Sequence, residues 1–159
     1  MHYHRSFGKS ILFVAILFGL VLGVFIGGFA ESYASNVPEK LSSYDHVEES
    51  RISLTGNSVF IDTNYDLRWS KFEDTNSMNP LIDKGHNGLE FIPTDVNDIH
   101  LGDVISFGYG DEVYIHRVVE IGKDEFGIYF VTKGDNNFNI DDGVRRFEDI
   151  QGVLFGVVF

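Results

Sequence analysis

An uninterrupted apolar run near the start of the chain contrasts with the short, alternating apolar segments that follow it. Residues 10–30 contain no charged side chain. As a helix with a rise of ~1.5 Å per residue, this run reaches about 30 Å, the thickness of a bilayer's hydrocarbon core. Arg5 and Lys9 precede the run, and Glu31 is the first charge after it. The positive-inside rule therefore predicts a single-pass membrane anchor, with residues 1–9 in the cytoplasm and the rest of the chain outside.

A buried core helix or a cleaved signal peptide would also be apolar. Residues 10–30 are apolar on every face, which disfavours a helix that packs on one side of a domain. Ser32-Tyr33-Ala34 offers small residues before a cleavage point, but the apolar part of a signal peptide is typically about 7–15 residues long. The length of the apolar run therefore favours a retained anchor, and cleavage remains the alternative. The polar residues 31–50 that follow are expected to form a juxtamembrane stalk.

From residue 51 onward the apolar positions come in short runs with little helical periodicity. Such runs, separated by Gly, Asn and Asp, are typical of strands joined by turns. The expected strands and short apolar runs are Arg51–Ile61, Asp66–Phe72, Gly88–Ile92, Asp103–Phe107, Val113–Ile121, Gly127–Thr132 and Gln151–Phe159. We expect hairpin turns at Gly108–Asp111 and Gly122–Glu125, and a short helical turn at Phe147–Ile150. This pattern predicts one mostly-β extracytoplasmic domain over residues 51–159, built as a sandwich or as a closed or half-closed barrel.

The charge of the chain is unevenly distributed. The 159 residues carry a formal charge of −12, and residues 1–30 hold two basic side chains and no acidic one. The remainder therefore holds 10 basic and 24 acidic side chains, a net charge of −14. A surface this acidic repels phosphate backbones, so we expect no nucleic-acid partner. The chain has no cysteine, which excludes disulfides, thiolate catalysis and cysteine-based zinc sites.

Three polar segments interrupt the β-rich sequence and carry the groups that a nucleophilic hydrolase needs. Ser77 precedes a Met-Asn-Pro sequence, His116 lies in an expected strand, and Asp135, Asp141 and Asp142 lie in one loop. Serine is a weak nucleophile at neutral pH, so a neighbouring base must take its proton and a third group usually orients that base. Each residue also has a plainer interpretation, as a helix cap, a packed histidine or turn-forming aspartates.

The local sequence suits both Ser77 and His116 to such roles. Pro80 biases Asn79 away from helical conformation, so Ser77 should lie on a turn that exposes its hydroxyl and its own N–H together. Strand alternation places His116 on the face opposite Ile115. An unperturbed imidazole titrates at about pH 6.5, which suits a general base near neutrality.

No metal site and no cofactor are predicted from these residues. The loop 135–142 is rich in oxygen donors, but it lacks the central Gly and terminal Glu of an EF-hand at their fixed offsets. His2 and His4 lie at the start of the chain. The other histidines in expected loops do not have the spacing of a ligand set: His46, His86 and His100.

In order and spacing, the polar segments resemble the signal peptidase I family, and more closely its ER-type branch, which includes archaeal and some Gram-positive enzymes. Ser77-Met78-Asn79-Pro80 resembles the box that holds the nucleophile. Tyr114–Val119 resembles the second box, where bacterial-type enzymes carry a lysine base and ER-type enzymes a histidine. The other similar stretches are Gly102–Phe107 (a Gly-Asp-Val strand), Phe130–Asn137 (the third box), Asp141-Asp142 (an acidic pair) and Gln151–Val153 (the closing stretch). The resemblance covers residues 70–159.

The resemblance implies a membrane-anchored serine endopeptidase that removes signal peptides from exported precursors, with a β-barrel core related to SH3-like barrels. It implies that Ser77 is the nucleophile, that His116 is the base, and that Thr75 helps the Ser77 N–H to hold the oxyanion. For the aspartate that orients the imidazole, Asp142 is the first choice, and Asp135 would support the loop or share the role. The stretch Phe138–Ile140 is a residue longer than is usual in the family, so the choice among Asp135, Asp141 and Asp142 stays open. The implied partners are signal-peptide-bearing precursors and the lipid bilayer, with other membrane subunits left open.

Two departures from the family's pattern keep other functions open. Asn79 replaces the acidic residue common after Ser-Met, and Gly85-His86 stands where a Gly-Asp is usual. The main alternative is therefore a catalytically inactive anchored β-domain that binds extracytoplasmic polypeptides or membrane partners. A self-cleaving or regulatory serine peptidase is a further alternative, but such enzymes usually use a lysine base, and this sequence offers His116.

Overall fold

Residues 41–159 are described by the computed structural model, and they fold into antiparallel strands and short 3₁₀ helices. The predicted anchor over residues 10–30 lies outside the described residues, as do residues 1–9 and most of the predicted stalk. In the described part, no helix has the length and hydropathy that a membrane crossing requires.

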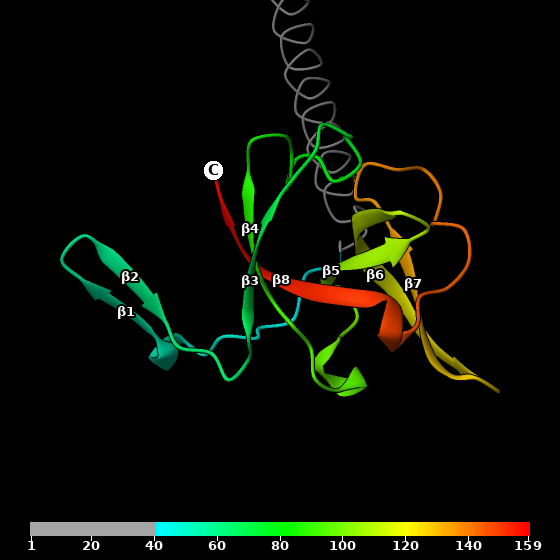
Figure 1. The fold of residues 1–159 in the computed structure, drawn as a ribbon, viewed down its shortest axis with the longest axis horizontal. Coiled ribbons are helices and arrows are strands. Elements are labelled where there is room, and N and C mark those ends of the chain that lie inside the picture. Colours follow the sequence, from blue (N-terminus) through cyan, green and yellow to red (C-terminus); the bar gives the residue numbers. More distant parts are fainter. Residues whose placement is uncertain (1–40) are drawn as a thin grey trace, which may run out of the picture. The chain divides into compact units, whose positions relative to one another are not determined.

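The strands of the described part form two antiparallel sheets (Figure 1). The smaller sheet consists of β1 (Ile52–Thr55) and β2 (Ser58–Ile61). The larger has the spatial order β3-β4-β8-β5-β6-β7. Its strands are β3 (Leu67–Lys71), β4 (Asn87–Phe91), β5 (Val104–Tyr109), β6 (Glu112–Asp124), β7 (Gly127–Lys133) and β8 (Ile150–Val158). The 3₁₀ helices are η1 (Glu49–Arg51), η2 (Val96–Asp98) and η3 (Phe147–Asp149).

Most of the expected strands are confirmed, and one is corrected. The hairpin β5–β6 turns within Gly108–Asp111 as expected, and the apolar C-terminal run is the central strand β8. The hairpin β6–β7 also forms, but β6 continues through Gly122–Asp124 and turns at residues 125–126, later than the expected turn at Gly122–Glu125. The prediction of a single strand over Arg51–Ile61 is wrong, because the chain reverses there to give β1 and β2. Gly56 has a φ of 60°, a left-handed conformation that glycine adopts without steric cost, and it allows this tight turn.

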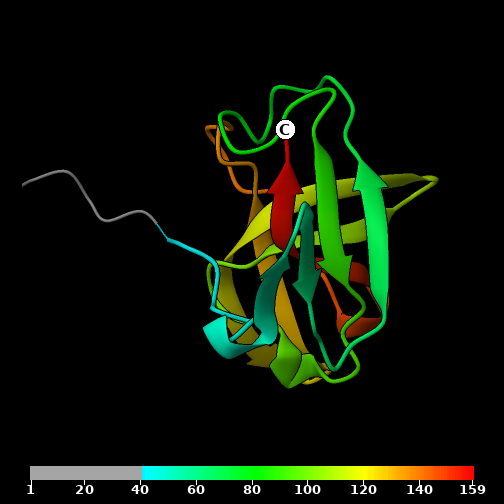
Figure 2. The same ribbon diagram turned by 90° about the vertical axis from the view of Figure 1, so that its left-hand side faces the viewer.

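The prediction of a mostly-β domain is confirmed, but the sheet is open where a barrel was expected. Among the described residues, β3 pairs only with β4 and β7 pairs with β6 as its neighbouring strand, so both remain sheet edges. Irregularities in register between β4 and β8, β5 and β8, and β6 and β7 bend the sheet. Figure 2 shows the result, with β3 and β4 (green) running across β6 and β7 (yellow to orange).

Apolar side chains cover both faces of the larger sheet. Adjacent residues point to opposite faces, so Val104 and Leu154 join one buried cluster while Ile105 and Val153 join another. The first cluster contains Phe91, Ile99, Ile105, Phe107, Val118, Phe130 and Val153. The second contains Met78, Ile82, Val104 and Leu154. Because residues 78–82 pack into this second cluster, the core itself fixes the position of the residue that precedes them, Ser77.

Candidate active site

Ser77 lies in the loop between β3 and β4, at the point where the chain enters a turn. Met78 is only 2% exposed, and its carbonyl accepts hydrogen bonds from the N–H groups of Leu81 (3.0 Å) and Ile82 (3.1 Å). The preceding Asn76 has a φ of 60°, a left-handed conformation that asparagine tolerates better than most residues. The buried methionine and this local twist leave Ser77 half-buried at the rim of a pocket.

Thr75 contacts both polar groups of Ser77. Its Oγ1 lies 3.1 Å from Ser77 Oγ and accepts a hydrogen bond from the Ser77 N–H at 3.5 Å. A hydroxyl and a backbone N–H this close together are two donors that can converge on one developing negative charge. The structure thus brings together the two residues named for the oxyanion site, and that role stays a prediction.

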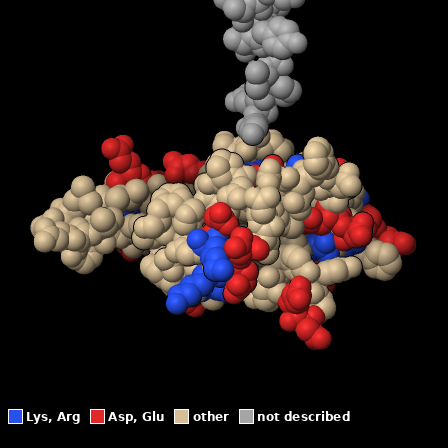
Figure 3. All heavy atoms as spheres, turned by 90° about the horizontal axis from the view of Figure 1, so that it is seen from above, with Lys and Arg blue, Asp and Glu red and all other residues tan. Residues whose placement is uncertain are grey.

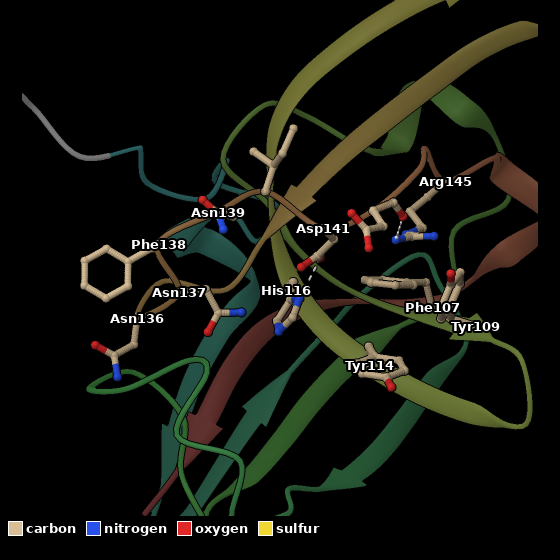
Figure 4. Close-up of a pocket in the computed structure, with 12 residues that line it drawn as sticks. Phe107, Tyr109, Tyr114, His116, Asn136, Asn137, Phe138, Asn139, Asp141 and Arg145 are labelled. Carbon is tan, nitrogen blue, oxygen red and sulfur yellow. Dashed lines mark hydrogen bonds and ion pairs between the residues drawn. The ribbon is translucent and has the colours of Figure 1, made fainter.

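His116 lies on β6 with its ring against a carboxylate, and the residue that supplies it is Asp141 (Figure 4). His116 is 6% exposed, and its Nδ1 lies 2.7 Å from Asp141 Oδ2. The same oxygen accepts a hydrogen bond from Thr132 Oγ1 at 2.7 Å. Because an ionised carboxylate only accepts hydrogen bonds, this contact holds the proton of a neutral imidazole on Nδ1. The other ring nitrogen, Nε2, is then free to accept a proton.

The surroundings of Asp141 keep it ionised. Partial burial acts to raise the pKa of Asp141, but hydrogen bonds from His116 and Thr132 outweigh burial and lower the pKa below its usual value. The nearby charge of Arg145 lowers this pKa further. A carboxylate that stays negative orients a neutral imidazole and stabilises the imidazolium that forms when His116 takes up a proton.

Of the three loop aspartates, the structure places Asp141 in contact with His116. The sequence favoured Asp142, yet its side chain is exposed and its backbone carbonyl accepts a hydrogen bond from Arg145 Nη2 at 2.8 Å. The N–H of Asp141 donates to the carbonyl of Thr132 at 2.8 Å, which ties Asp141 alongside β7 and within reach of His116. Asp142 borders the pocket around Asp141 but makes no hydrogen bond to His116 within residues 41–159.

Asp135 binds Arg117 and has no hydrogen bond to His116. The guanidinium of Arg117 donates from Nε and Nη2 to the two carboxylate oxygens, at 2.7 Å each. Its third nitrogen, Nη1, donates to the carbonyl of Gly102 at 2.7 Å. Such a bidentate pair has a fixed orientation, so Asp135 anchors the start of the loop to β6.

The loop after β7 also holds the Ser77 turn, through residues that the sequence did not single out. The N–H of Asn136 donates to the Ser77 carbonyl at 2.9 Å, and its side-chain amide donates to the Asn76 carbonyl at 3.0 Å. A Cβ at Gly134 would lie 2.7 Å from the Ser77 carbonyl oxygen, so a larger residue does not fit there. Both Gly134 and Asn136 belong to the polar segment Lys133–Asn137, of which the sequence singled out only Asp135 as a candidate site residue.

Ser77 and His116 line the same pocket, which has a volume of about 880 Å³. A second pocket of about 640 Å³ lies around Asp141, and His116, Tyr114 and Asn137 border both. The first pocket is flanked by two strand edges, because among the strands of residues 41–159 β3 pairs only with β4 and residues 112–116 of β6 pair only with β5. Within residues 41–159 no hydrogen bond links Ser77 to His116, and the Ser77 hydroxyl contacts that of Thr75.

Comparisons with known proteins give one match. Over 81 residues the chain is 35% identical to signal peptidase I W of Bacillus subtilis (strain 168). The similarity is to a signal peptidase I. The match covers 50% of this chain and 43% of that protein, so it is partial, and it supports the signal peptidase I family as a whole without resolving a branch. No family model matches the chain, and no solved structure matches it.

Proposed function

We propose that this chain is a membrane-anchored serine endopeptidase of the ER-type, Ser–His branch, which removes signal peptides from exported precursors. One observation carries the proposal: His116 Nδ1 lies 2.7 Å from Asp141 Oδ2, on the border of the pocket that Ser77 also lines. A histidine oriented by a carboxylate is the group that activates a neighbouring serine in acyl transfer. The partial similarity to signal peptidase I W supports this class of reaction.

The proposed reaction proceeds through an acyl-enzyme. Ser77 Oγ attacks the scissile carbonyl carbon while its proton passes to His116 Nε2. The Ser77 N–H and the Thr75 hydroxyl stabilise the oxyanion of the tetrahedral intermediate. The C–N bond then breaks, and His116 returns the proton to the leaving amine. Water, deprotonated by His116, hydrolyses the ester and restores Ser77.

Asp141 acts in this scheme as a positioning residue. It contacts His116 and lies on the far side of the ring from Nε2, the nitrogen that exchanges protons with Ser77. Its ionised carboxylate keeps the Nδ1 proton in place before the reaction and balances the charge of the imidazolium during it. Thr132 in turn holds Asp141 through the hydrogen bond of 2.7 Å from its hydroxyl.

An extended polypeptide is the substrate that suits this pocket. The unpaired edges of β3 and of residues 112–116 of β6 offer backbone donors and acceptors to a chain lying between them, the mode called β-augmentation. Basic side chains on the face seen in Figure 3 lie beside acidic ones. Together with the net charge of −12, this supports a polypeptide over a nucleic acid as the partner.

The proposed location rests on the sequence. The uncharged run over residues 10–30 and the basic Arg5 and Lys9 before it support a single-pass anchor with a cytoplasmic N-terminus. In that orientation the domain that holds Ser77 lies outside the membrane, on the side where translocated precursors emerge. Whether the bilayer also brings other membrane subunits to this chain is left open.

Precursor cleavage by the full chain in detergent tests the proposal. We expect Ser77→Ala and His116→Ala each to lower the rate at least about 10³-fold. Ser77→Ala should unfold at the wild-type temperature, whereas His116→Ala removes a buried ring and should stay folded with a lower Tm. Ser58→Ala, an exposed position on β2, is the matched control and should cleave at the wild-type rate. Full activity of Ser77→Ala would contradict the proposal. A wild-type chain that binds precursors and does not cleave them would favour the inactive polypeptide-binding domain instead.

A further inference from the structure

A second cluster of ligand-type side chains lies outside both pockets of the candidate active site. It consists of His46, in the segment before β1, and of His100 and Asp103, in the turn before β5. Each residue offers one ligand atom, and the three atoms lie within 4.8 Å of one another. The Asp103 side chain is fully buried, and the His46 side chain is 6% exposed. Polar groups this deeply enclosed need partners, and here they face each other.

We propose that His46, His100 and Asp103 bind a divalent transition-metal ion of the zinc type. Two imidazole nitrogens and one carboxylate oxygen form a donor set that Zn²⁺ accepts, with water at the fourth position. His46 Nε2 lies 3.0 Å and His100 Nδ1 lies 3.8 Å from Asp103 Oδ2. Ligand atoms about 2.0–2.2 Å from one tetrahedral ion lie roughly 3.3 Å apart, so small shifts of these side chains suffice.

Within residues 41–159, the hydrogen bonds of the cluster leave one ring nitrogen of His100 without a partner. Its Nδ1 is buried and has no hydrogen-bond partner among the described residues. A buried ring nitrogen without a partner is costly in a folded protein. The ring stacks on Tyr44 with ring centroids 3.9 Å apart and an interplanar angle of 10°, which keeps its plane beside Asp103. A metal ion between His100, His46 and Asp103 would give this nitrogen a partner.

Hydrogen bonds and ring packing from neighbouring residues orient the proposed ligands, as the residues around a metal's direct ligands do in metal sites. Asp103 accepts hydrogen bonds from the N–H of Tyr44 (2.9 Å, to Oδ1) and from the N–H of His100 (2.7 Å, to Oδ2). The His46 ring packs against Phe91 with centroids 4.8 Å apart. Fixed outer partners of this kind raise metal affinity by orienting the ligands in advance. On binding, the ion would replace the proton between His46 and Asp103.

Such an ion would clamp the start of the described chain to the sheet. His46 belongs to the segment that leaves residue 41, whereas Asp103 directly precedes β5 and its carbonyl accepts the N–H of Val118 on β6 (2.7 Å). The proposed role is therefore structural, and it does not depend on catalysis at Ser77. Only His100 and Asp103 are close in sequence, which explains why the spacing of histidines along the chain did not reveal the site.

Zinc binding by the full chain tests the proposal. We would use chain that carries His2→Ala and His4→Ala, so that the terminal histidines cannot bind metal, purified in detergent and stripped with a chelator. Calorimetric titration with Zn²⁺ should give one site per chain. At about 100 times the dissociation constant, Zn²⁺ should raise the Tm by about 5–10 °C. Co²⁺ in the same site should give the absorption of a tetrahedral complex.

Single substitutions locate the site. His46→Gln and His100→Gln should each weaken Zn²⁺ binding at least about 10-fold and reduce the rise in Tm. His86→Gln, which changes a histidine outside the cluster, should bind as the parent does. If His46→Gln does not fold, His100→Gln still tests the proposal, because the His100 side chain is 39% exposed and its replacement should disturb the fold less. The proposal would be overturned if Zn²⁺ binding to the parent chain does not saturate, or if His100→Gln binds Zn²⁺ with the affinity of the parent. The three residues would then be a hydrogen-bonded cluster without a metal.

Discussion

At the scale of single residues, the proposed chemistry depends on which nitrogen of His116 carries the proton. The 2.7 Å contact with Asp141 holds that proton on Nδ1 and leaves Nε2 as the base. Thr132 and the lowered pKa of Asp141 keep this arrangement in place, because a protonated carboxyl could donate to the ring and reverse the tautomer. The function assigned to Ser77 thus depends on a carboxylate on the far side of the imidazole.

Replacing Asp141 should therefore impair catalysis far more than replacing its neighbour. We expect Asp141→Asn to lower kcat for precursor cleavage by about 10²- to 10⁴-fold, because an amide no longer fixes the tautomer or balances the imidazolium. Asp142→Asn is the matched control, since its side chain is exposed, and should stay within about threefold of wild type. The measurement is the steady-state cleavage rate of the purified variants. A greater loss of kcat in Asp142→Asn than in Asp141→Asn would show that the orienting aspartate is misassigned.

The lowered pKa of Asp141 also predicts how stability responds to acid. Its pKa in the folded chain lies below the value of about 3.9 in an unfolded chain, so its ionised form stabilises the fold. That contribution is present above about pH 4 and is lost as the pH falls through the lower folded pKa. Urea unfolding of wild type and Asp141→Asn should therefore show a stability difference at pH 7 that shrinks by pH 3. A difference that stays constant with pH would contradict this coupling.

The sequence singled out Ser77 and His116 but did not single out the carboxylate that contacts His116. Ser77 and His116 were selected because the short segments around them resemble, in order and spacing, two boxes of the signal peptidase I family. Asp135, Asp141 and Asp142 share one loop, and the backbone contact of Asp141 with Thr132 decides which of them faces inward. Such a long-range contact leaves no pattern in a single sequence.

At the scale of elements, the loop after β7 joins the parts of the candidate site. Its first residues hold Arg117 through Asp135 and the Ser77 turn through Asn136, and Asp141 further along it holds His116. Three separate segments are thereby fixed by one connection, the 13 residues 134–146 between β7 and η3, which is long enough to be typical of functional loops. Changes in this loop should alter the site more than they alter the sheet.

Gly134 is the position in this loop where a single methyl group should matter most. Gly134→Ala would place a Cβ 2.7 Å from the Ser77 carbonyl oxygen and should displace the Ser77 turn. A shift of this size should lower kcat/KM by about 10²-fold with little loss of Tm. Gly108→Ala is the matched control on β5, because its Cβ would meet only the flexible end of Gln151 at 3.4 Å. Equal effects of the two substitutions on kcat/KM would contradict the proposed role of the loop.

Turn residues made the hairpins β5–β6 and β6–β7 predictable. Gly110 has a φ of 63°, a conformation that favours glycine, and it lies in the turn expected at Gly108–Asp111. The second turn was expected at Gly122–Glu125, but Gly122 is paired within β6 and the glycine with a positive φ is Gly127, at 112°. The β1–β2 turn at Gly56 carried the same signal, but the apolar residues on both sides suggested one continuous strand. Turn residues therefore predicted that these hairpins form, and they located the β5–β6 turn more closely than the β6–β7 turn.

At the scale of the whole molecule, the order of the strands could not be predicted from the sequence. The last strand, β8, lies between β4 and β5 in the middle of the sheet, which needs pairings between residues far apart in the chain. The same order leaves β3 and part of β6 with open edges around the pocket of Ser77 and His116. The open sheet thus supports a substrate chain lying between these edges, which a closed barrel would not admit.

The central claim is that Ser77 and His116 act as one catalytic unit, and a double-mutant cycle of precursor cleavage tests it most directly. We predict that Ser77→Ala and His116→Ala each lower the cleavage rate at least about 10³-fold, and that the double variant is no slower than either single variant. Losses that multiply in the double variant, or a single variant that cleaves within tenfold of wild type (about 1.4 kcal/mol in barrier), would contradict the claim.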